Sequence, residues 1–420
     1  MKTNAHEKLK DLVKFVREKS PFYREIYYDI DIEKFELQDL PIVDQEKFWI
    51  ANSLENNQLL TGEIDNGIVL KSGGTSGNPK FSFFTKTEWE MFTKIFGEGL
   101  DQCNLKHGDR VANLFYSGEL YASFIFIMKS LEYAKTPVIH FPITGKCPDS
   151  SLLEVLQELN INVLAGVPTS FMHLASLVRS KNLKLPVKKI LYGGEGLYQD
   201  QRAVLEDSFP GVIISSIGYA SVDGGHLGFV DKTCLPGEHV CFNQYSIMEI
   251  LDENTNEPIT KTGIVGKLVY TNLERTLMPI IRYPVGDLAQ WSSVGEKFLL
   301  QGRSEVGARV GPVTVNRDDF LNILKSYSHK NLIMGFQLII EHDKQKDFLI
   351  WRIASDYGNI KLLSRDIKLL YQLFNKEKKM YQESVELGLI GDIQIQICEY
   401  EDLVRNRRTG KLRNVIDRRN

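Results

Sequence analysis

The segment Ser72-Gly73-Gly74-Thr75-Ser76-Gly77-Asn78-Pro79-Lys80 has the residue types and spacing of a phosphate-binding loop. Its hydroxyl groups and backbone N–H groups could surround phosphate oxygens, and its lysine could reach the same oxygens. Its glycines let the backbone turn tightly and approach a ligand closely. Apolar residues at 67–70 and 81–85 predict one strand before the loop and one after it. We therefore expect a phosphate-binding turn between two strands.

The residues around the lysine exclude a Walker-type phosphate loop. In a Walker loop, Gly-Lys is followed by Ser or Thr and then by a helix. Here Lys80 follows Pro79, and the next residues are typical of a strand. The segment therefore predicts a different nucleotide-binding architecture. The alternative interpretation is a solvent-exposed loop without a ligand.

Length and charge narrow the class of protein. The chain has 420 residues, which predicts two or three domains, and its hydrophobic content of 43% is that of a globular protein with a sizeable core. Its 51 basic and 54 acidic residues nearly balance, so we expect no nucleic-acid partner. Residues 1–19 are a charged amphipathic pattern rather than a signal peptide, and we expect no membrane partner. Five scattered cysteines indicate reduced thiols and a cytoplasmic location.

The order of predicted elements indicates an α/β fold in the first part of the chain. Strands are expected at 162–168, 189–192 and 213–217, and helices at 152–159 and 170–177. Glycines follow the second and third of these strands. Ligands would therefore lie at the carboxyl ends of the strands.

The pattern changes to consecutive strands near residue 247 and later to a smaller α+β unit. The consecutive strands are expected at 247–251, 266–271 and 297–300. The smaller unit is expected to contain strands at 336–341, 348–354 and 391–399 and one long charged helix at 360–381.

Five segments, taken in order, resemble the core motifs of the adenylate-forming superfamily, which includes acyl-CoA synthetases, adenylation domains and luciferases. They are Ser72–Lys80, Tyr219-Ala220-Ser221-Val222-Asp223, Tyr283-Pro284-Val285-Gly286-Asp287, Gly302-Arg303-Ser304-Glu305 and Thr409-Gly410-Lys411-Leu412-Arg413. The chain is most similar to the phenylacetate–coenzyme A ligase family, which shares the segment 21–24 and the ending 410–419. The resemblance covers nearly the whole chain and depends on the complete set of motifs.

The resemblance implies a large N-terminal domain of mixed sheets and helices, residues 1–302, that binds ATP and a carboxylic acid. It also implies a small mobile α+β domain, residues 303–420, that carries a lysine for adenylation. In the implied reaction, a carboxylate attacks the α-phosphate of ATP and gives acyl-AMP and pyrophosphate. A thiol such as coenzyme A, or the phosphopantetheine of an acyl carrier protein, then displaces AMP. Mg²⁺ and basic groups would neutralise the phosphate charge.

The resemblance also assigns the nucleotide-binding residues. The β- and γ-phosphates would lie against the loop of Ser72, Gly73, Gly74, Thr75, Ser76 and Gly77, with Lys80 adding positive charge. The turn of Gly194, Glu195 and Gly196 resembles the loop that touches adenine. Tyr219 would stack beside the adenine, next to Ala220 and Ser221. Asp287 corresponds to the carboxylate that accepts hydrogen bonds from the ribose hydroxyls.

Four further residues are assigned to catalysis, metal binding and domain motion. Lys411 resembles the lysine that bridges the substrate carboxylate and the α-phosphate in the transition state. Arg303 would reach the ribose or the phosphates, and Glu305 matches the hinge position. Asp223 stands where the family has a Mg²⁺-binding glutamate and supplies the hard oxygen ligand that this cation prefers.

The expected acid pocket is aromatic. It would lie near Phe115, Tyr116, Tyr121, Tyr192 and Gly218, which hints at an aryl or arylacetic acid. Neither the particular acid nor the oligomeric state follows from the sequence, and a homodimer stays open.

Several alternative interpretations stay open. The arginines around Lys411 could form a basic tail that binds RNA or an acidic partner. The acyl group could pass to a carrier protein, a protein side chain or an amine. Valine at 222 and 285 and the shorter Asp223 depart from the family pattern, so the chain could be a nucleotide-binding module that has lost catalysis. The group His226, Cys234, His239 and Cys241 has ligand types that suit Zn²⁺, but its irregular spacing favours ordinary loop residues.

Overall fold

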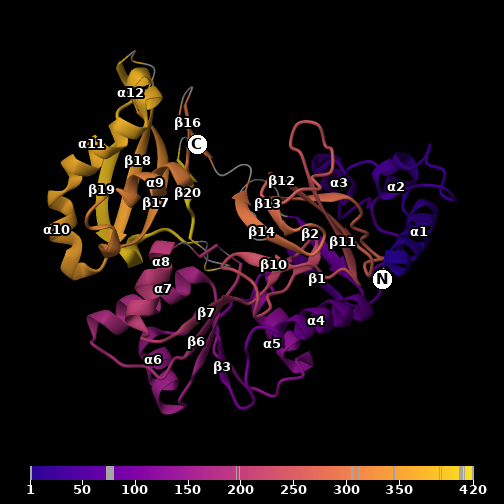
Figure 1. Cartoon of the computed structure of the whole chain (residues 1–420), viewed down its shortest axis with the longest axis horizontal. Coiled ribbons are helices and arrows are strands. Elements are labelled where there is room, and N and C mark those ends of the chain that lie inside the picture. Colours follow the sequence, from indigo (N-terminus) through magenta and orange to yellow (C-terminus); the bar gives the residue numbers. More distant parts are fainter. Residues whose placement is uncertain are drawn as a thin grey trace. The chain divides into compact units, whose positions relative to one another are not determined.

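A computed structural model describes residues 2–71, 80–194, 196–197, 199–303, 307–310, 313–343, 346–386, 388, 390–405, 410 and 412–418. The chain divides into two compact units (Figure 1). The first comprises Met1–Gly166, Lys189–Gly196 and Ile214–Ser304, and the second comprises Val167–Lys188, Leu197–Ile213 and Glu305–Asn420. The second unit thus includes two segments from the range that the sequence assigns to the large domain. The expectation of a mobile domain that begins at 303 stays a prediction.

A parallel five-stranded sheet gives the first unit its α/β character. Its strand order is β4 (Ile139–Pro142), β3 (Arg110–Asn113), β5 (Val163–Gly166), β6 (Lys189–Tyr192) and β7 (Ile213–Ser216). Every residue of β5 and β6 is buried, as is typical of the central strands of a parallel sheet. The predicted strands at 162–168, 189–192 and 213–217 are therefore confirmed, and so is the α/β fold class.

The helices of the first unit begin where the sequence offers caps. Thr85 and Glu88 form a capping box at the start of α4, because each side chain accepts a hydrogen bond from the other's backbone N–H. Ser20 caps α2 and Pro21 occupies its first turn. These helices are α1 (Lys2–Lys19), α2 (Pro21–Ile26), α3 (Gln45–Ala51), α4 (Lys86–Leu100), α5 (Ser123–Tyr133) and α6 (Asp149–Glu158).

Antiparallel strands complete the first unit. One sheet has the order β10 (Glu238–Val240), β14 (Lys297–Arg303), β13 (Tyr283–Ser293), β12 (Val265–Asn272) and β11 (Ser246–Leu251). Two hairpins are formed by β1 (Ile68–Lys71) with β2 (Phe81–Phe84), and by β8 (Tyr219–Ser221) with β9 (Gly225–Gly228). A core of buried apolar residues joins α1 and α2 to this sheet, so the N-terminal helices are part of the unit.

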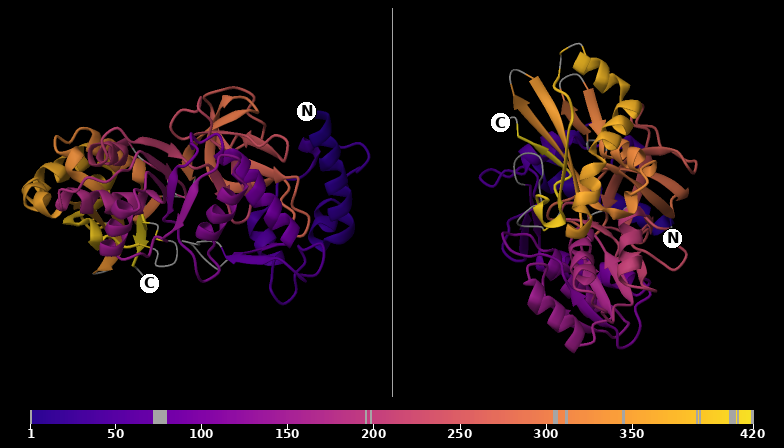
Figure 2. Two further views of the ribbon diagram at one scale, coloured as in Figure 1. Left: turned by 90° about the horizontal axis from the view of Figure 1, so that it is seen from below. Right: turned by 90° about the vertical axis from the view of Figure 1, so that its left-hand side faces the viewer.

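The second unit contains a sheet of order β19 (Gln394–Glu399), β18 (Lys346–Ser355), β17 (Ile333–Asp343) and β20 (Val415–Asp417). Phe336, Leu338 and Ile340 alternate along β17 and pack in a core with residues of the neighbouring helices. Figure 1 and Figure 2 show those helices along the sheet. The other elements are α7 (Pro168–Ser180), α8 (Gln199–Ser208), β15 (Gly307–Val310), β16 (Val313–Asn316), α9 (Arg317–Lys325), α10 (Ile360–Arg365), α11 (Ile367–Glu377) and α12 (Lys379–Glu386).

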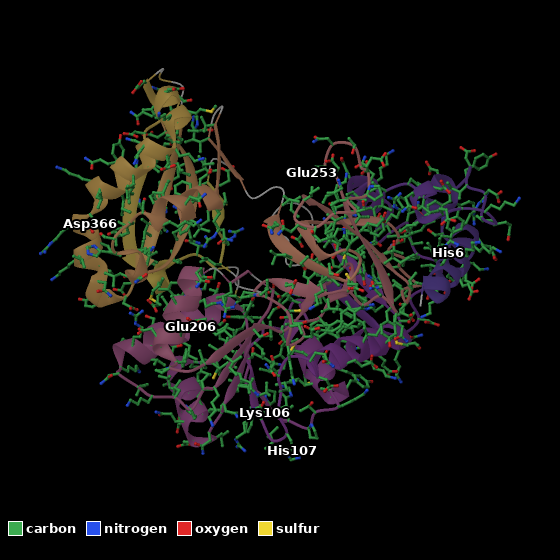
Figure 3. The ribbon with its side chains drawn as sticks, in the orientation of Figure 1. His6, Lys106, His107, Glu206, Glu253 and Asp366 are labelled. Atoms are coloured by element: carbon green, nitrogen blue, oxygen red, sulfur yellow. The ribbon has the colours of Figure 1, made fainter. Side chains whose placement is uncertain are left out.

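The prediction of one long helix at 360–381 is wrong, because the segment is divided into α10, α11 and α12. The first break falls at Asp366, which Figure 3 labels. Its carboxylate accepts a hydrogen bond of 2.7 Å from the Tyr327 hydroxyl and lies 2.8 Å from Nδ1 of His329. The second break falls at Lys378, whose backbone is not helical. The first break therefore coincides with a tertiary contact of Asp366, which the apolar periodicity of the sequence does not report.

Within the described part of the chain, no helix combines the length and the apolar composition that crossing a membrane requires.

Candidate active site

The strands around the predicted phosphate loop form an antiparallel hairpin. Ile68 pairs with Phe84, and Lys71 pairs with Phe81. The prediction of one strand before the loop and one after it is therefore confirmed. Residues 72–79, Glu195, Glu305 and Lys411 lie outside the described residues, as does the side chain of Arg303. The roles expected for these residues stay predictions.

Lys80, the last residue of the predicted loop, lies against Trp49 of α3. Its Nζ is 5.2 Å from the centroid of the indole ring, which is the geometry of a cation–π contact. Asp44 caps α3 and the buried Phe48 anchors it, so the helix holds Trp49 in place. Sequence reasoning missed Trp49, since nothing in the sequence connects it to a lysine so far along the chain.

Trp49 leads to a second motif through Tyr283. Its Nε1 donates a hydrogen bond of 3.0 Å to the hydroxyl of Tyr283, and that hydroxyl donates one of 3.0 Å to Oδ2 of Asp223. Burial raises the pKa of Tyr283, and the negative charge of Asp223 raises it further, so the hydroxyl stays a donor. This chain of contacts brings together Lys80, Asp223 and the segment 283–287 from three of the predicted motifs.

Asp223 is half-buried, and its carboxylate is fixed in orientation. Oδ1 accepts a hydrogen bond of 3.0 Å from the N–H of Gly224, while Oδ2 is bound by Tyr283. The described residues contain no group of three or more His, Cys, Asp or Glu side chains that could enclose a metal ion. A single carboxylate nevertheless fits Mg²⁺, because this cation is usually held by one or two carboxylates together with substrate phosphates.

Arg275 ties the loop hairpin to the turn at Asp223, and sequence reasoning missed it too. Its Nη1 donates to the backbone oxygen of Asp223, its Nη2 donates to that of Phe83 at 2.8 Å, and its Cζ lies 4.0 Å from the centroid of the Phe84 ring. Burial lowers its pKa to about 10, and Glu88 and Asp223 oppose that effect, so the side chain stays charged at neutral pH. The charge adds a positive potential beside the β1–β2 hairpin and Asp223.

The residues expected to bind adenine and ribose also lie together. The hydroxyl of Tyr219, on β8, donates a hydrogen bond to Oδ2 of Asp287, on β13. The centroid of the Tyr219 ring is 6.1 Å from that of Phe298 and 5.7 Å from that of His239. Tyr219 is therefore packed against aromatic side chains as well as bonded to Asp287. Two motifs that are far apart in sequence are therefore in direct contact.

Gly218, just before Tyr219, needs to be glycine. Its φ is +124°, a conformation that other residues rarely adopt, and a Cβ atom here would lie 2.8 Å from Cζ of Phe96. The ring of Phe126 lies 4.7 Å from Phe96 and 4.5 Å from Phe92, so aromatic side chains of α4 and α5 pack beside this backbone.

The expected pocket residues lie near the carboxyl ends of the parallel strands. Phe115 is buried two residues beyond the end of β3, Tyr192 is the buried last residue of β6, and Tyr116 is half-buried. A Cβ atom on Gly193 would lie 3.5 Å from the Phe115 ring, so these two strand ends are in contact. Tyr121 is buried and forms a backbone bridge with Gly118. Their contact with an acid stays a prediction.

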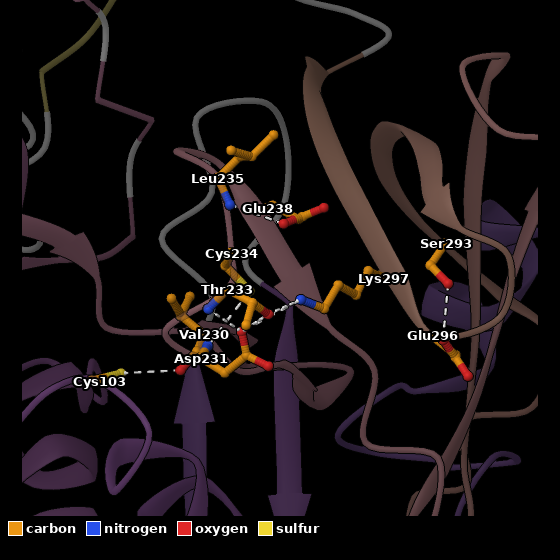
Figure 4. Close-up of polar contacts among 10 residues, drawn as sticks. All are labelled: Cys103, Val230, Asp231, Thr233, Cys234, Leu235, Glu238, Ser293, Glu296 and Lys297. Carbon is orange, nitrogen blue, oxygen red and sulfur yellow. Dashed lines mark hydrogen bonds and ion pairs between the residues drawn. The ribbon is translucent and has the colours of Figure 1, made fainter.

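The candidate zinc ligands have separate surroundings. His239 lies 3.2 Å from Oγ of Ser216 and 3.1 Å from the carbonyl oxygen of Gly237. Cys234 accepts a hydrogen bond from the N–H of Asp231 in the turn that Figure 4 shows. Burial lowers the pKa of His226 to about 3 and raises that of Cys241 to about 12, so Cys241 is a neutral thiol at neutral pH. The arrangement favours ordinary buried residues over a zinc site.

Comparison with known proteins relates the chain to ligases. No family model matches it. A phenylacetate-coenzyme A ligase of Thermus thermophilus is 25% identical over 327 residues, which are 76% of this chain and 70% of that protein. An indoleacetate–lysine synthetase of Pseudomonas savastanoi is 25% identical over 288 residues, which are 66% of each chain. A phenylacetate-coenzyme A ligase of Aromatoleum evansii is 21% identical over 98% of this chain and 93% of its own.

Solved structures show the same fold. The crystal structure of 2-hydroxyisobutyryl-CoA ligase in its postadenylation state matches with a TM-score of 0.75 and 17% identity, over 99% of this chain and 89% of that one. The acyl acid amido synthetase AtGH3.15 matches with a TM-score of 0.62 and 15% identity, over 95% and 86%. The resemblance to adenylate-forming enzymes, and to phenylacetate–coenzyme A ligases among them, is therefore confirmed.

Proposed function

We propose that this phenylacetate–coenzyme A ligase-like member of the adenylate-forming superfamily activates a carboxylic acid with ATP and then transfers the acyl group to a thiol. The observation that carries the proposal is the chain of contacts from Lys80 through Trp49 and Tyr283 to Asp223. It gathers residues of three motifs in one region of the first unit, as a single nucleotide site requires. The ligases among the relatives support the same reaction class.

In the proposed reaction, Lys80 and Arg275 offset part of the charge on ATP. Asp223 would hold Mg²⁺, which supplies further charge neutralisation when the nucleotide is bound. Asp287 would accept hydrogen bonds from the ribose hydroxyls in place of the one from Tyr219. Lys411 would contact both the acid's carboxylate and the α-phosphate. The carboxylate oxygen forms a bond to phosphorus, pyrophosphate leaves, and the thiol sulfur later replaces AMP at the acyl carbon.

For the acid, we propose an aromatic one. Phe115 and Tyr192 are buried aromatic residues at the carboxyl ends of parallel strands, and aromatic side chains of this kind line most small-molecule sites. A thiol is the first choice of acceptor because the ligases match more of this chain than the lysine synthetase does.

A panel of acids and acceptors tests the proposal. Aromatic, fatty and amino acids would be incubated with ATP and Mg²⁺, and AMP release would be measured with coenzyme A, with lysine and without an acceptor. We expect AMP release that requires an aromatic acid and is accelerated by coenzyme A. Acceleration by lysine alone would instead assign the chain to amide formation. ATP binding without AMP release for any acid would contradict the proposal.

A further inference from the structure

Gln337 is a fully buried amide in the middle of strand β17. Its neighbours in sequence, Phe336 and Leu338, belong to the apolar core on the other face of the sheet. Burying an amide costs free energy unless its donors and its acceptor are all paired. An amide in such a place therefore contributes through what it binds rather than through core packing.

All the hydrogen-bonding groups of Gln337 bind the backbone of two other segments. Its Nε2 donates to the carbonyl oxygen of Val404 at 2.8 Å and to that of Arg413 at 2.7 Å. Its Oε1 accepts a hydrogen bond of 2.9 Å from the N–H of Val404. Both amide hydrogens and the carbonyl oxygen are thus used.

The two segments that Gln337 binds run side by side. The N–H of Arg413 donates to the carbonyl oxygen of Val404 at 3.1 Å, and Arg405 forms an antiparallel bridge with Leu412. The described residues on either side of 406–409 and 411 therefore meet at one buried side chain. One residue beyond Arg413, Asn414 accepts a hydrogen bond of 3.1 Å from Arg317, which fixes the same segment.

We propose that Gln337 is a positioning residue for Lys411, an inference that rests on the proposed function. Lys411 lies between Gly410 and Leu412 in the sequence, two residues before Arg413. A lysine has a long flexible side chain, so its ammonium group can be placed reproducibly only if its backbone is fixed. In the proposal, the hydrogen bonds of Gln337 to Val404 and Arg413 supply that constraint from the neighbouring described residues. Misplacement by about 1 Å costs a reaction roughly 100-fold.

Separate assays of the two half-reactions test this role. Gln337→Met keeps the side-chain volume and removes all three hydrogen bonds. We expect acid-dependent exchange of pyrophosphate into ATP to fall by about 10- to 100-fold, chiefly in kcat. Thioester formation from a synthetic acyl-adenylate and coenzyme A does not need Lys411 in the proposed reaction and should change by less than about threefold. Equal losses in both half-reactions would show a purely structural role and overturn the inference.

Gln396 provides a matched control on the same face of the same sheet. It is also a glutamine, but its Oε1 accepts hydrogen bonds only from the side chain of Arg352, at 3.1 and 3.2 Å, among the contacts described for it. Gln396→Met should leave both half-reactions within about twofold of the wild type. Should Gln337→Met fail to fold, Gln337→Asn replaces it, because the shorter side chain stays a neutral amide but loses the reach that binds both segments.

Hydrogen–deuterium exchange distinguishes a failure of this inference from a failure of the proposed function. We expect the amides of Val404 and Arg413 to exchange at least about tenfold faster in Gln337→Met, while β18 and β19 stay protected. Unchanged protection of those two amides would overturn the positioning role of Gln337 even in an active ligase. Faster exchange in a protein that shows no adenylation with any acid would support the effect of Gln337 on the backbone and contradict the proposed function alone.

Discussion

Tyr283 donates a hydrogen bond of 3.0 Å to Oδ2 of Asp223, although the two residues belong to different motifs, 60 positions apart. The bond fixes the carboxylate that we propose for Mg²⁺. The Tyr283 hydroxyl also accepts a hydrogen bond from Nε1 of Trp49, so removing this hydroxyl disturbs both Asp223 and Trp49. Preorganised groups of this kind are worth more than their contact energy, because they need no rearrangement during the reaction.

Tyr283→Phe therefore should lower pyrophosphate exchange about tenfold and raise the Mg²⁺ concentration for half-maximal activity, with a loss of about 1 kcal/mol in the free energy of unfolding. Titration of Mg²⁺ in the exchange assay measures this. Tyr371→Phe is the matched control, since the hydroxyl of Tyr371 donates a similar bond to Asp392 in the second unit. An unchanged Mg²⁺ dependence in Tyr283→Phe would contradict the metal role of Asp223.

Asp287→Asn should weaken ATP binding more than acid binding. Asparagine can still accept the hydrogen bond of Tyr219, but it loses the charge that strengthens bonds from ribose hydroxyls. We expect KM for ATP to rise by about 10- to 100-fold, with a change in KM for the acid below about threefold. Initial rates at varied ATP and acid measure both. A rise confined to the acid would place Asp287 elsewhere in the reaction.

Glu249→Ala should destabilise the first unit strongly. Glu249 and Arg282 form a buried pair, with Oε1 3.0 Å from Nη2 and Oε2 3.1 Å from Nε. Burial raises the pKa of Glu249, and Arg282 opposes that effect, so losing the glutamate leaves a buried positive charge without its partner. We expect a loss of about 3–5 kcal/mol in the free energy of unfolding, measured in urea.

The control for that measurement is the exposed ion pair of Lys14 and Glu33, in which Nζ of the lysine lies 2.8 Å from Oε1 of the glutamate. Glu33→Ala should cost less than about 1 kcal/mol. Similar losses in the two variants would show that burial does not set the strength of these pairs.

Stability should fall on mild acidification because two histidines are buried. Burial lowers the pKa of His226 to about 3 and that of His239 to about 4, whereas unfolded histidine titrates near 6.5. Below pH 6.5 the unfolded chain therefore binds protons that the folded chain does not. The stabilising contribution is complete well above pH 6.5 and decreases as the pH falls, by about 1.4 kcal/mol for each histidine at pH 5.5.

Urea unfolding between pH 7.5 and 5.5 tests the effect. His226→Leu should reduce the slope of stability against pH, because it removes one of the two titrating groups. The rings of Phe92 and Phe242 beside His226 can pack against leucine, so the variant should fold. His107→Leu, at an exposed position that Figure 3 labels, should leave the slope unchanged. A slope that is the same in wild type and His226→Leu would contradict this account of the pH dependence.

The sequence predicts those parts of the fold that depend on local pattern. The buried strand at 163–166 is a continuous apolar run, the strand at 189–192 is apolar after Lys189, and the loop of 72–80 is bounded by strands, as expected. The expectation failed at 360–381, where the helix breaks at Asp366 because that residue binds Tyr327 and His329. Such a contact depends on tertiary structure and leaves no periodic signal.

The residues of the candidate site likewise include some that the sequence predicts and some that only the folded structure reveals. Asp223, Asp287 and Lys80 could be found because they belong to motifs with a recognisable order. Trp49 and Arg275 could not, because their importance comes only from their positions against Lys80 and Asp223 in the folded chain. Gln337 was also missed, since its partners are backbone groups, whose pairing does not depend on residue type.

The central claim is that these motifs form one site for ATP and a carboxylic acid. The most direct measurement is exchange of labelled pyrophosphate into ATP with the preferred acid, in the wild type, Lys411→Ala and Lys361→Ala, an exposed lysine on α10 of the same unit. The account predicts acid-dependent exchange that falls by at least about 100-fold in Lys411→Ala and is unchanged in Lys361→Ala. Exchange that persists in Lys411→Ala, or its absence with every acid in a wild type that binds ATP, would contradict it.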